Sequence, residues 1–299
     1  MKYELKEKWL YIDTESLFVK TIQEFFDNYI PSKKVQHLLI QNKNILLDGN
    51  PVKREDDIIG LNLMINIYPE TYNYEPCDLK ADIVYEDELV IIVNKPKNVL
   101  VHSDGNTEEV TLTRMVESYL VDRNYISALP IHRLDKETSG LVVFSKSVVF
   151  QPLLDKLLAE KQIRREYLAF VAGRFEPGRN MVIDKPIGND RHVNGKRIVH
   201  PKGQSALTKV KGLAVNKKNN YSILLCTLDT GRTHQIRVHL SSEHYPILND
   251  ELYGVSSKLL VRMGLFARLV SMYHPLKEDV LEVEAELPND LNRLYNEAL

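Results

Sequence analysis

A cluster of charged side chains precedes one apolar run of this 299-residue chain. In the segment IHRLDKETSGLVVFSK (131–146), Asp135 follows Arg133 closely, and the apolar run 141–145 has the length of a buried strand. A carboxylate beside an arginine stays ionised at neutral pH. An ionised carboxylate in a fixed position can act as a nucleophile or as a base. We therefore expect chemistry at Asp135, at the mouth of a buried strand.

A second charged segment, TGRTHQIRVHL (230–240), has an arginine at its centre. Its alternation predicts a strand with Arg237 on one face, between apolar neighbours. A partly buried arginine requires a carboxylate, and the candidates are Asp135 and Asp229. At this point a purely structural ion pair is the alternative to a catalytic one.

Other chemistries have weaker support. Glycoside hydrolysis normally needs a second carboxylic acid, and Glu137 could equally face solvent. No HxxEH-like set is formed by the histidines at positions 192, 200, 234, 239 and 244, so no metal is expected. In RREYLAFVAG (164–173), Tyr167 follows Arg165 on a predicted strand. This tyrosine is either part of a core or, with an RNA partner, a platform on which a base stacks.

Composition places the chain among cytoplasmic proteins. No run of about 18 apolar residues predicts a membrane span, and the N-terminus has no signal-peptide core. Cys77 and Cys226 are far apart, which favours free thiols in a reducing compartment. The net charge is −2, but residues 146–218 hold 16 basic and 6 acidic side chains, a net charge of +10. Such a block favours a polyanionic partner, although a solvated face would look the same.

The pattern of elements divides the chain into two units. Residues 14–70 predict a small α/β module with two short helices and a hairpin, residues 71–80 a linker, and residues 81–299 a larger domain. In the module, Thr21 and Ser32 are predicted N-caps. In the larger domain many strands alternate with few helices, which predicts an α+β fold on a mostly antiparallel sheet. The apolar segment LLVRMGLFARLVSMYHP is ambiguous between helix and strand.

Several motifs resemble those of the RluA-type pseudouridine synthases. HRLDKETSGL agrees with the family signature of His-Arg-Leu-Asp, two variable residues and Thr-Ser-Gly-Leu. The resemblance continues, in chain order, in NKPKNVLVH, REYLAFVAG, TGRTHQIRVHL, YPILNDELYG and GLFARLVSMYHP, and covers about residues 80–290. Asn98 and Asn249 replace glycines, Arg165 replaces a lysine and Phe266 replaces a histidine of the family pattern. The first unit resembles, more weakly, the small RNA-binding module of the fourth small-subunit ribosomal protein.

This resemblance implies an α+β catalytic domain with a central cleft that converts uridine in RNA to pseudouridine without a metal or a cofactor. By matching position, Asp135 is the catalytic aspartate, Arg237 pairs with it, and Tyr167 stacks on the uracil. Arg133 would fill the gap left by the flipped base. The further candidates for RNA contact are His132, Arg165, Lys95, Lys33 and Lys34. Thr138, Ser139 and Gly140 are expected to shape the active-site loop, a role that His132 could share.

The expected substrate is large-subunit ribosomal RNA, because synthases with such an N-terminal module most often act there; transfer RNA is the alternative. Two other functions stay open at this stage. One is an RNA-binding or ribosome-assembly factor with an inactive catalytic domain. The intact Asp135, Tyr167 and Arg237 argue against it, and the departures at Asn98, Asn249 and Phe266 keep it open. The other is an N-glycoside hydrolase that releases the base. We expect a monomer.

Overall fold

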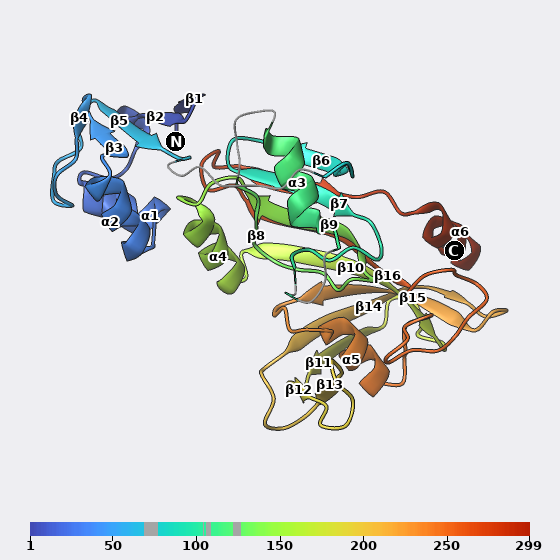
Figure 1. Cartoon of the computed structure of the whole chain (residues 1–299). Coiled ribbons are helices and arrows are strands. Elements are labelled where there is room, and N and C mark those ends of the chain that lie inside the picture. The colour runs from blue at the N-terminus through green and yellow to red at the C-terminus, as the bar shows by residue number, and fades with distance from the viewer. Residues whose placement is uncertain (69–76, 104, 106–108, 122–126) are drawn as a thin grey trace.

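The computed structural model describes residues 1–68, 77–103, 105, 109–121 and 127–299, and shows a small N-terminal module beside a larger α+β domain (Figure 1). Most of the predicted linker at 71–80 falls within residues 69–76, outside the described part. The larger domain agrees with the α+β fold expected from the strand-rich sequence.

The module is a five-stranded antiparallel sheet with two helices. In pairing order the strands are β1 (Tyr3–Lys6), β2 (Trp9–Asp13), β5 (Asn62–Asn66), β3 (Ile45–Leu47) and β4 (Asn50–Pro51). The helices are α1 (Ile22–Tyr29) and α2 (Lys33–Gln41), and a short 3-10 turn (Thr14–Ser16) follows β2. Thr21 and Ser32 cap α1 and α2 as predicted. The sheet also takes in two strands that precede residue 14, where the module was expected to begin.

The module packs directly on the larger domain. The Ser147 hydroxyl donates to the Ile67 carbonyl at 2.6 Å, and the Tyr68 hydroxyl donates to the Glu88 carbonyl at 3.2 Å. The apolar cores of the two units are continuous. The N-terminal module therefore contacts the larger domain just ahead of β7 (Val90–Lys95) and α4 (Gln151–Ala159), and α4 lies beside it in Figure 1.

The larger domain is built on one mixed sheet. Its main path runs β11 (Asn180–Asp184), β14 (Leu207–Asn216), β15 (Tyr221–Leu228), β10 (Ile163–Ala172), β16 (Leu265–Tyr273), β9 (Ser139–Ser145), β7 (Val90–Lys95), β6 (Ile83–Glu86). Off this path, β17 (Val280–Glu284) pairs with β16, and β8 (Leu129–Pro130) pairs with β9. A separate hairpin joins β12 (Ile187–Asn189) and β13 (Arg197–Val199). Among the described strand pairs, only β9 with β16 is parallel.

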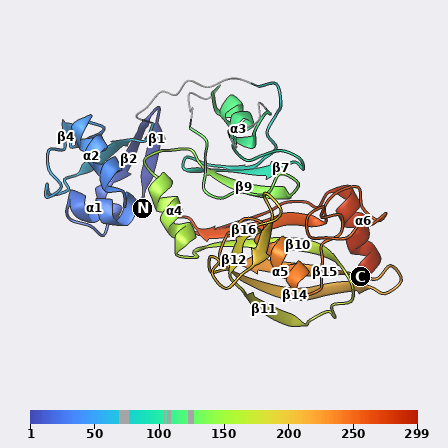
Figure 2. The same ribbon diagram turned by 60° about the horizontal axis from the view of Figure 1, so that its bottom comes forward.

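Both faces of this sheet are buried at its centre. Along β7, Val90 and Ile92 belong to one apolar cluster, whereas Ile91 and Val93 belong to another on the opposite face. The covering helices are α3 (Leu112–Val121), α4 (Gln151–Ala159), α5 (Gln235–Ser242) and α6 (Asn289–Ala298). Figure 2 shows α5 beside β14, which it contacts together with β13. Of the ambiguous segment LLVRMGLFARLVSMYHP, the part from Leu265 to Tyr273 forms β16, a central strand.

The segment TGRTHQIRVHL is not the strand that its alternation predicted. The chain leaves β15 at Leu228, and His234 adopts a left-handed backbone (φ 58°) before α5 begins. All side chains from Gln235 to Leu240 are buried, so the helix has no exposed face and no helical period of polarity. Its polar residues have buried partners instead: His239, for example, pairs with Thr208 at 2.8 Å.

Candidate active site

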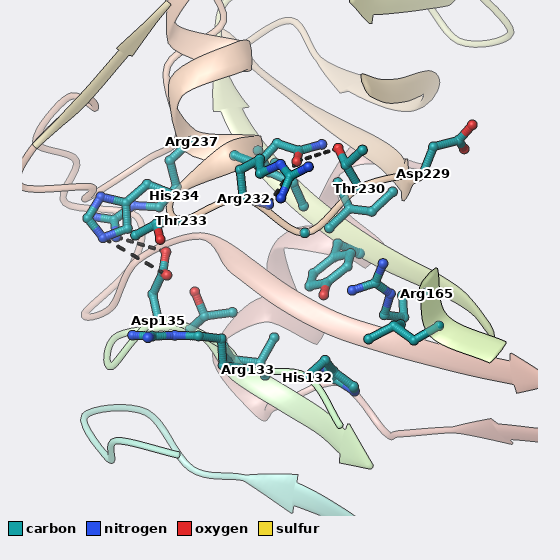
Figure 3. Close-up of a pocket in the computed structure, with 18 of the residues that line it drawn as sticks. His132, Arg133, Asp135, Arg165, Asp229, Thr230, Arg232, Thr233, His234 and Arg237 are labelled. Atoms are coloured by element: carbon teal, nitrogen blue, oxygen red, sulfur yellow. Dashed lines mark hydrogen bonds and ion pairs between the residues drawn. The ribbon is translucent and has the colours of Figure 1, made fainter. Parts of the chain in front are cut away.

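The active-site candidates meet at a cavity of about 510 Å³ between four parts of the chain. Its walls are the loop before β9, the end of α4, the start of β10, and the segment that leads into α5 (Figure 3). The predicted residues that line it are His132, Arg133, Asp135, Thr138, Arg165, Tyr167 and Arg237. A cavity of this size can hold a small organic ligand.

Asp135 and Arg237 form an ion pair at this cavity. Arg237 Nη1 donates to Asp135 Oδ2 at 3.0 Å, and the arginine side chain is 3% exposed against 16% for the aspartate. Burial by itself lowers the pKa of the Arg237 guanidinium, but the hydrogen bonds and charges of Asp250 and Asp135 raise it above its ordinary value. The guanidinium is therefore a permanent cation, and Asp135 faces the cavity with a fixed partner.

A second carboxylate, Asp250, completes this arrangement. Its oxygens accept from Arg237 Nε at 2.8 Å and Nη2 at 2.9 Å, and its side chain is fully buried. Sequence reasoning missed this residue, although it lies within the motif YPILNDELYG. The candidate named instead, Asp229, points away from Arg237 (Figure 3) and pairs with Lys209 at 3.0 Å.

Lys95 binds the backbone of the loop that carries Asp135. The lysine is fully buried, and its ammonium donates to the carbonyls of Val99 at 2.6 Å, Pro96 at 3.0 Å and Lys136 at 3.0 Å. The sequence placed Lys95 among the residues that contact RNA. Its burial contradicts that assignment: the side chain fastens the loop and does not reach an RNA-facing surface.

Gly140 and Ser139 join the same loop to β16. Gly140 has φ +115°, and a Cβ atom there would lie 2.1 Å from the carbonyl oxygen of Ala267. Only glycine allows this close parallel contact between β9 and β16. The Ser139 hydroxyl accepts a hydrogen bond from Arg262, and Thr138 is buried beside it. These contacts agree with a structural role for the three residues.

Two of the departures from the family pattern have a simple backbone explanation. Asn98 and Asn249, which stand where the pattern has glycine, adopt φ values of 63° and 56°. Asparagine tolerates this left-handed region better than other residues with a side chain. These replacements therefore keep the required backbone and do not indicate a degenerate site.

The remaining candidates divide into those in the cavity and those far from it. Arg133 is exposed at the mouth, whereas burial lowers the pKa of His132 to about 3, so this histidine is neutral and accepts from the Val143 amide at 3.2 Å. Lys33 and Lys34 are exposed on α2 of the module and do not line the cavity. Lys33 is 3.6 Å from Glu55.

Arg165 and Tyr167 come from β10 and form the opposite wall. Tyr167 is buried, and burial raises the pKa of its hydroxyl. Arg165 is 7% exposed. Within the described residues no carboxylate lies within ion-pair distance of its guanidinium, and its Nε atom has no hydrogen-bond partner. A buried cation without an acidic partner is costly, which indicates that the cavity receives a polar or aromatic group.

Comparison with known proteins identifies the family to which this chain belongs. Residues 89–242 match the family model described as RNA pseudouridylate synthase. The chain belongs to this family. It is therefore an RNA pseudouridine synthase, as the motif around Asp135 led us to expect.

The relatives cover nearly the whole chain. An uncharacterized RNA pseudouridine synthase of Bacillus subtilis (strain 168), YhcT, is 34% identical over 260 residues, 87% of this chain and 84% of the relative. The ribosomal large subunit pseudouridine synthase D of Escherichia coli (strain K12) is 31% identical over 293 residues, 92% of this chain and 88% of the relative. The solved structure of human RNA pseudouridylate synthase domain containing 1 is 23% identical, covers 72% of this chain and 86% of that one, and superposes with a TM-score of 0.58. This structural likeness supports the α+β fold.

No helix of the described residues is long and apolar enough to cross a membrane. No group of three or more His, Cys, Asp and Glu side chains in the same part of the chain could hold a metal ion.

Proposed function

We propose that this synthase acts on large-subunit ribosomal RNA and that Asp135 is its catalytic carboxylate. The observation that carries the proposal is the ion pair of Asp135 with Arg237 at a cavity of about 510 Å³. The choice of RNA is supported by relatives at 30–32% identity that are named ribosomal large subunit pseudouridine synthase D.

The reaction needs a uridine outside its helix. Extruding a base costs a few kcal/mol, which stacking and phosphate contacts in the enzyme can offset. Arg133, at the mouth of the cavity, would occupy the gap in the RNA, while Tyr167 in the opposite wall would stack on the uracil. The basic segment 146–218 would contact the phosphates around the target nucleotide.

Asp135 would then act on the flipped nucleotide, either by adding to the ribose or by removing its 2′ proton. In both routes the N1–C1′ bond breaks and the uracil stays in the cavity and turns. C5 bonds to C1′, the C5 proton leaves to solvent, and N1 gains a proton. One carboxylate is sufficient because the base is retained and reused, so no second acid is required.

Release of tritium from RNA labelled at uridine C5 tests the proposal. We expect release from large-subunit ribosomal RNA, but not from transfer RNA, with the wild-type enzyme and with Asp82→Asn, a change at an exposed carboxylate beside β6. Asp135→Asn should release none and bind RNA within a few-fold of wild type. Loss of binding by this variant would mean that Asp135 is structural.

Each alternative outcome of this assay would point to a different function. Release from transfer RNA alone would refute the ribosomal target. Free uracil would indicate an N-glycoside hydrolase. Binding of ribosomal RNA without any release, even from ribosomal assembly intermediates, would indicate an RNA-binding factor.

A further inference from the structure

The Tyr253 hydroxyl joins a surface hairpin to the active site. It accepts a hydrogen bond from the backbone amide of Arg197, on β13, at 2.7 Å. On its other side it lies 2.8 Å from Nδ1 of His234. Since a backbone N–H can only donate, the hydroxyl proton is free to be donated to the histidine.

This chain of contacts selects one tautomer of His234. If Nδ1 accepts from the tyrosine, the proton of the neutral ring is on Nε2, which lies 4.0 Å from Oδ1 of Asp135. With the opposite tautomer, the Tyr253 hydroxyl would face two donors and its own proton would lack this acceptor. The Nε2 lone pair would also face a carboxylate. Both effects are unfavourable.

The ring is neutral and held in one orientation. Burial lowers the pKa of His234; the facing charges are those of Asp135 and Glu137 from the loop before β9, Arg237 from α5, and Asp250. The ring contacts that of Tyr253 edge to face, with centroids 5.6 Å apart. The left-handed backbone of His234, just ahead of α5, aims the side chain into the cavity (Figure 3).

Both the backbone and the ring of Tyr253 are held by contacts with neighbouring residues. Its amide donates to Asp250 Oδ1 at 3.2 Å, and its carbonyl accepts from the Ser241 hydroxyl at 3.0 Å. Its ring lies 5.3 Å from the Arg237 guanidinium carbon. Tyr253 also packs on a small apolar cluster that links the hairpin to α5, formed by Ile187, Val199, Ala206 and Val238.

We propose that Tyr253 and His234 are positioning residues for the reaction, in which the Tyr253 hydroxyl keeps the His234 proton on Nε2 and directs that N–H toward Asp135. Arg237 holds one oxygen of the carboxylate, and Nε2 of His234 lies 4.0 Å from the other. The proposal rests on the catalytic role assigned to Asp135. Misplacement of a reacting group by about 1 Å can reduce a rate about 100-fold, so a defined N–H facing the second oxygen of Asp135 favours turnover.

The tautomer can be measured without any RNA. In 15N-labelled full-length enzyme, long-range 1H–15N correlation spectra distinguish Nε2–H from Nδ1–H, and the His234 signals are those absent from His234→Gln. We expect Nε2–H in the wild type and in Tyr245→Phe, the control that removes a hydroxyl bonded to Arg179 outside the cavity. Tyr253→Phe, which keeps the ring, should give a mixture of the two tautomers. An unchanged tautomer in Tyr253→Phe would overturn the proposal.

Kinetic measurements test whether this tautomer matters for turnover. They use whichever RNA the wild type modifies, so an error in the proposed RNA target does not affect the outcome. Tyr253→Phe should lower kcat about 10- to 100-fold, with KM changed less than about 3-fold. His234→Ala should lower kcat at least as much, and His234→Gln should restore part of it because the amide supplies an N–H. An increase in KM alone would assign Tyr253 to RNA binding and refute a positioning role. Should Tyr253→Phe fail to fold, equal rates for His234→Ala and His234→Gln would refute it as well.

Discussion

Asp250 binds Arg237 through both carboxylate oxygens, in a fully buried ion pair with distances of 2.8 and 2.9 Å. Two of the three guanidinium nitrogens are thereby fixed, and the third, Nη1, points to Asp135. Arg237 therefore stays in place while Asp135 is free to react. The same Asp250 oxygen that binds Nη2 also accepts from the amides of Leu252 and Tyr253, so the turn after α5 is part of the same unit.

Replacement of Asp250 by asparagine should damage stability and activity together. Removing one partner of a buried ion pair typically costs about 3–5 kcal/mol, and we expect a loss of about 3 kcal/mol in the free energy of unfolding. Urea denaturation measures it. The control is Glu284→Gln, which breaks the exposed pair with Arg268 and should cost less than about 1 kcal/mol. Equal effects of the two variants would contradict the central role of Asp250.

Gly140→Ala should disrupt the active-site loop. The new methyl group would overlap the Ala267 carbonyl, and φ +115° is unfavourable for alanine. Strain and overlap each cost about 1–3 kcal/mol, so we expect a loss of about 3 kcal/mol or more, with loss of turnover. Gly178→Ala separates the two effects, because Gly178 has φ +79° but nothing within 4 Å of a Cβ atom. It should cost only about 1–2 kcal/mol; a similar loss in Gly140→Ala would mean that the loop moves aside.

Local signals in the sequence predicted much of the fold. The N-caps Thr21 and Ser32 and the hairpin of the N-terminal module are determined by residues near one another in the chain. Such elements can be predicted because their stabilising contacts are local. The family motifs supplied the architecture of the larger domain, which no local pattern contains.

The errors lie where distant parts of the chain meet. The helix α5 was predicted as a strand because it is buried all round and so lacks a helical pattern of polarity. Asp250 was missed as the partner of Arg237 because that pairing depends on the turn after α5. Lys95 looked like an RNA contact, since a lysine is usually exposed, and only the folded structure shows its three carbonyl partners.

Lys95 should make stability depend on pH. Burial lowers the pKa of Lys95 to about 7. Below that pH both folded and unfolded chains carry the proton, and the cost of burying the charge is constant. Between about pH 7 and 10 the unfolded chain binds a proton that the folded chain does not, so the free energy of unfolding rises with pH. Relative to Lys95→Met, the wild type should gain about 1 kcal/mol per pH unit between about pH 7.5 and 9. Parallel curves for the two proteins, from urea denaturation across this range, would show that the lysine stays charged.

Replacing Arg165 should reduce kcat/KM without reducing the free energy of unfolding. Its guanidinium is buried at the cavity, and no carboxylate of the described residues is within ion-pair distance of it. Arg165→Met removes this unpaired charge, so we expect an unfolding free energy equal to or above that of the wild type. We also expect kcat/KM to fall about 10-fold or more, because a contact to the flipped nucleotide is lost. The matched control is Arg164→Met on the other face of β10, where the arginine is half-exposed and pairs with Glu282 at 2.8 Å. This change should leave kcat/KM within about 2-fold and cost less than about 1 kcal/mol. A loss of stability in Arg165→Met without a loss of activity would reverse the assignment and make Arg165 a structural residue.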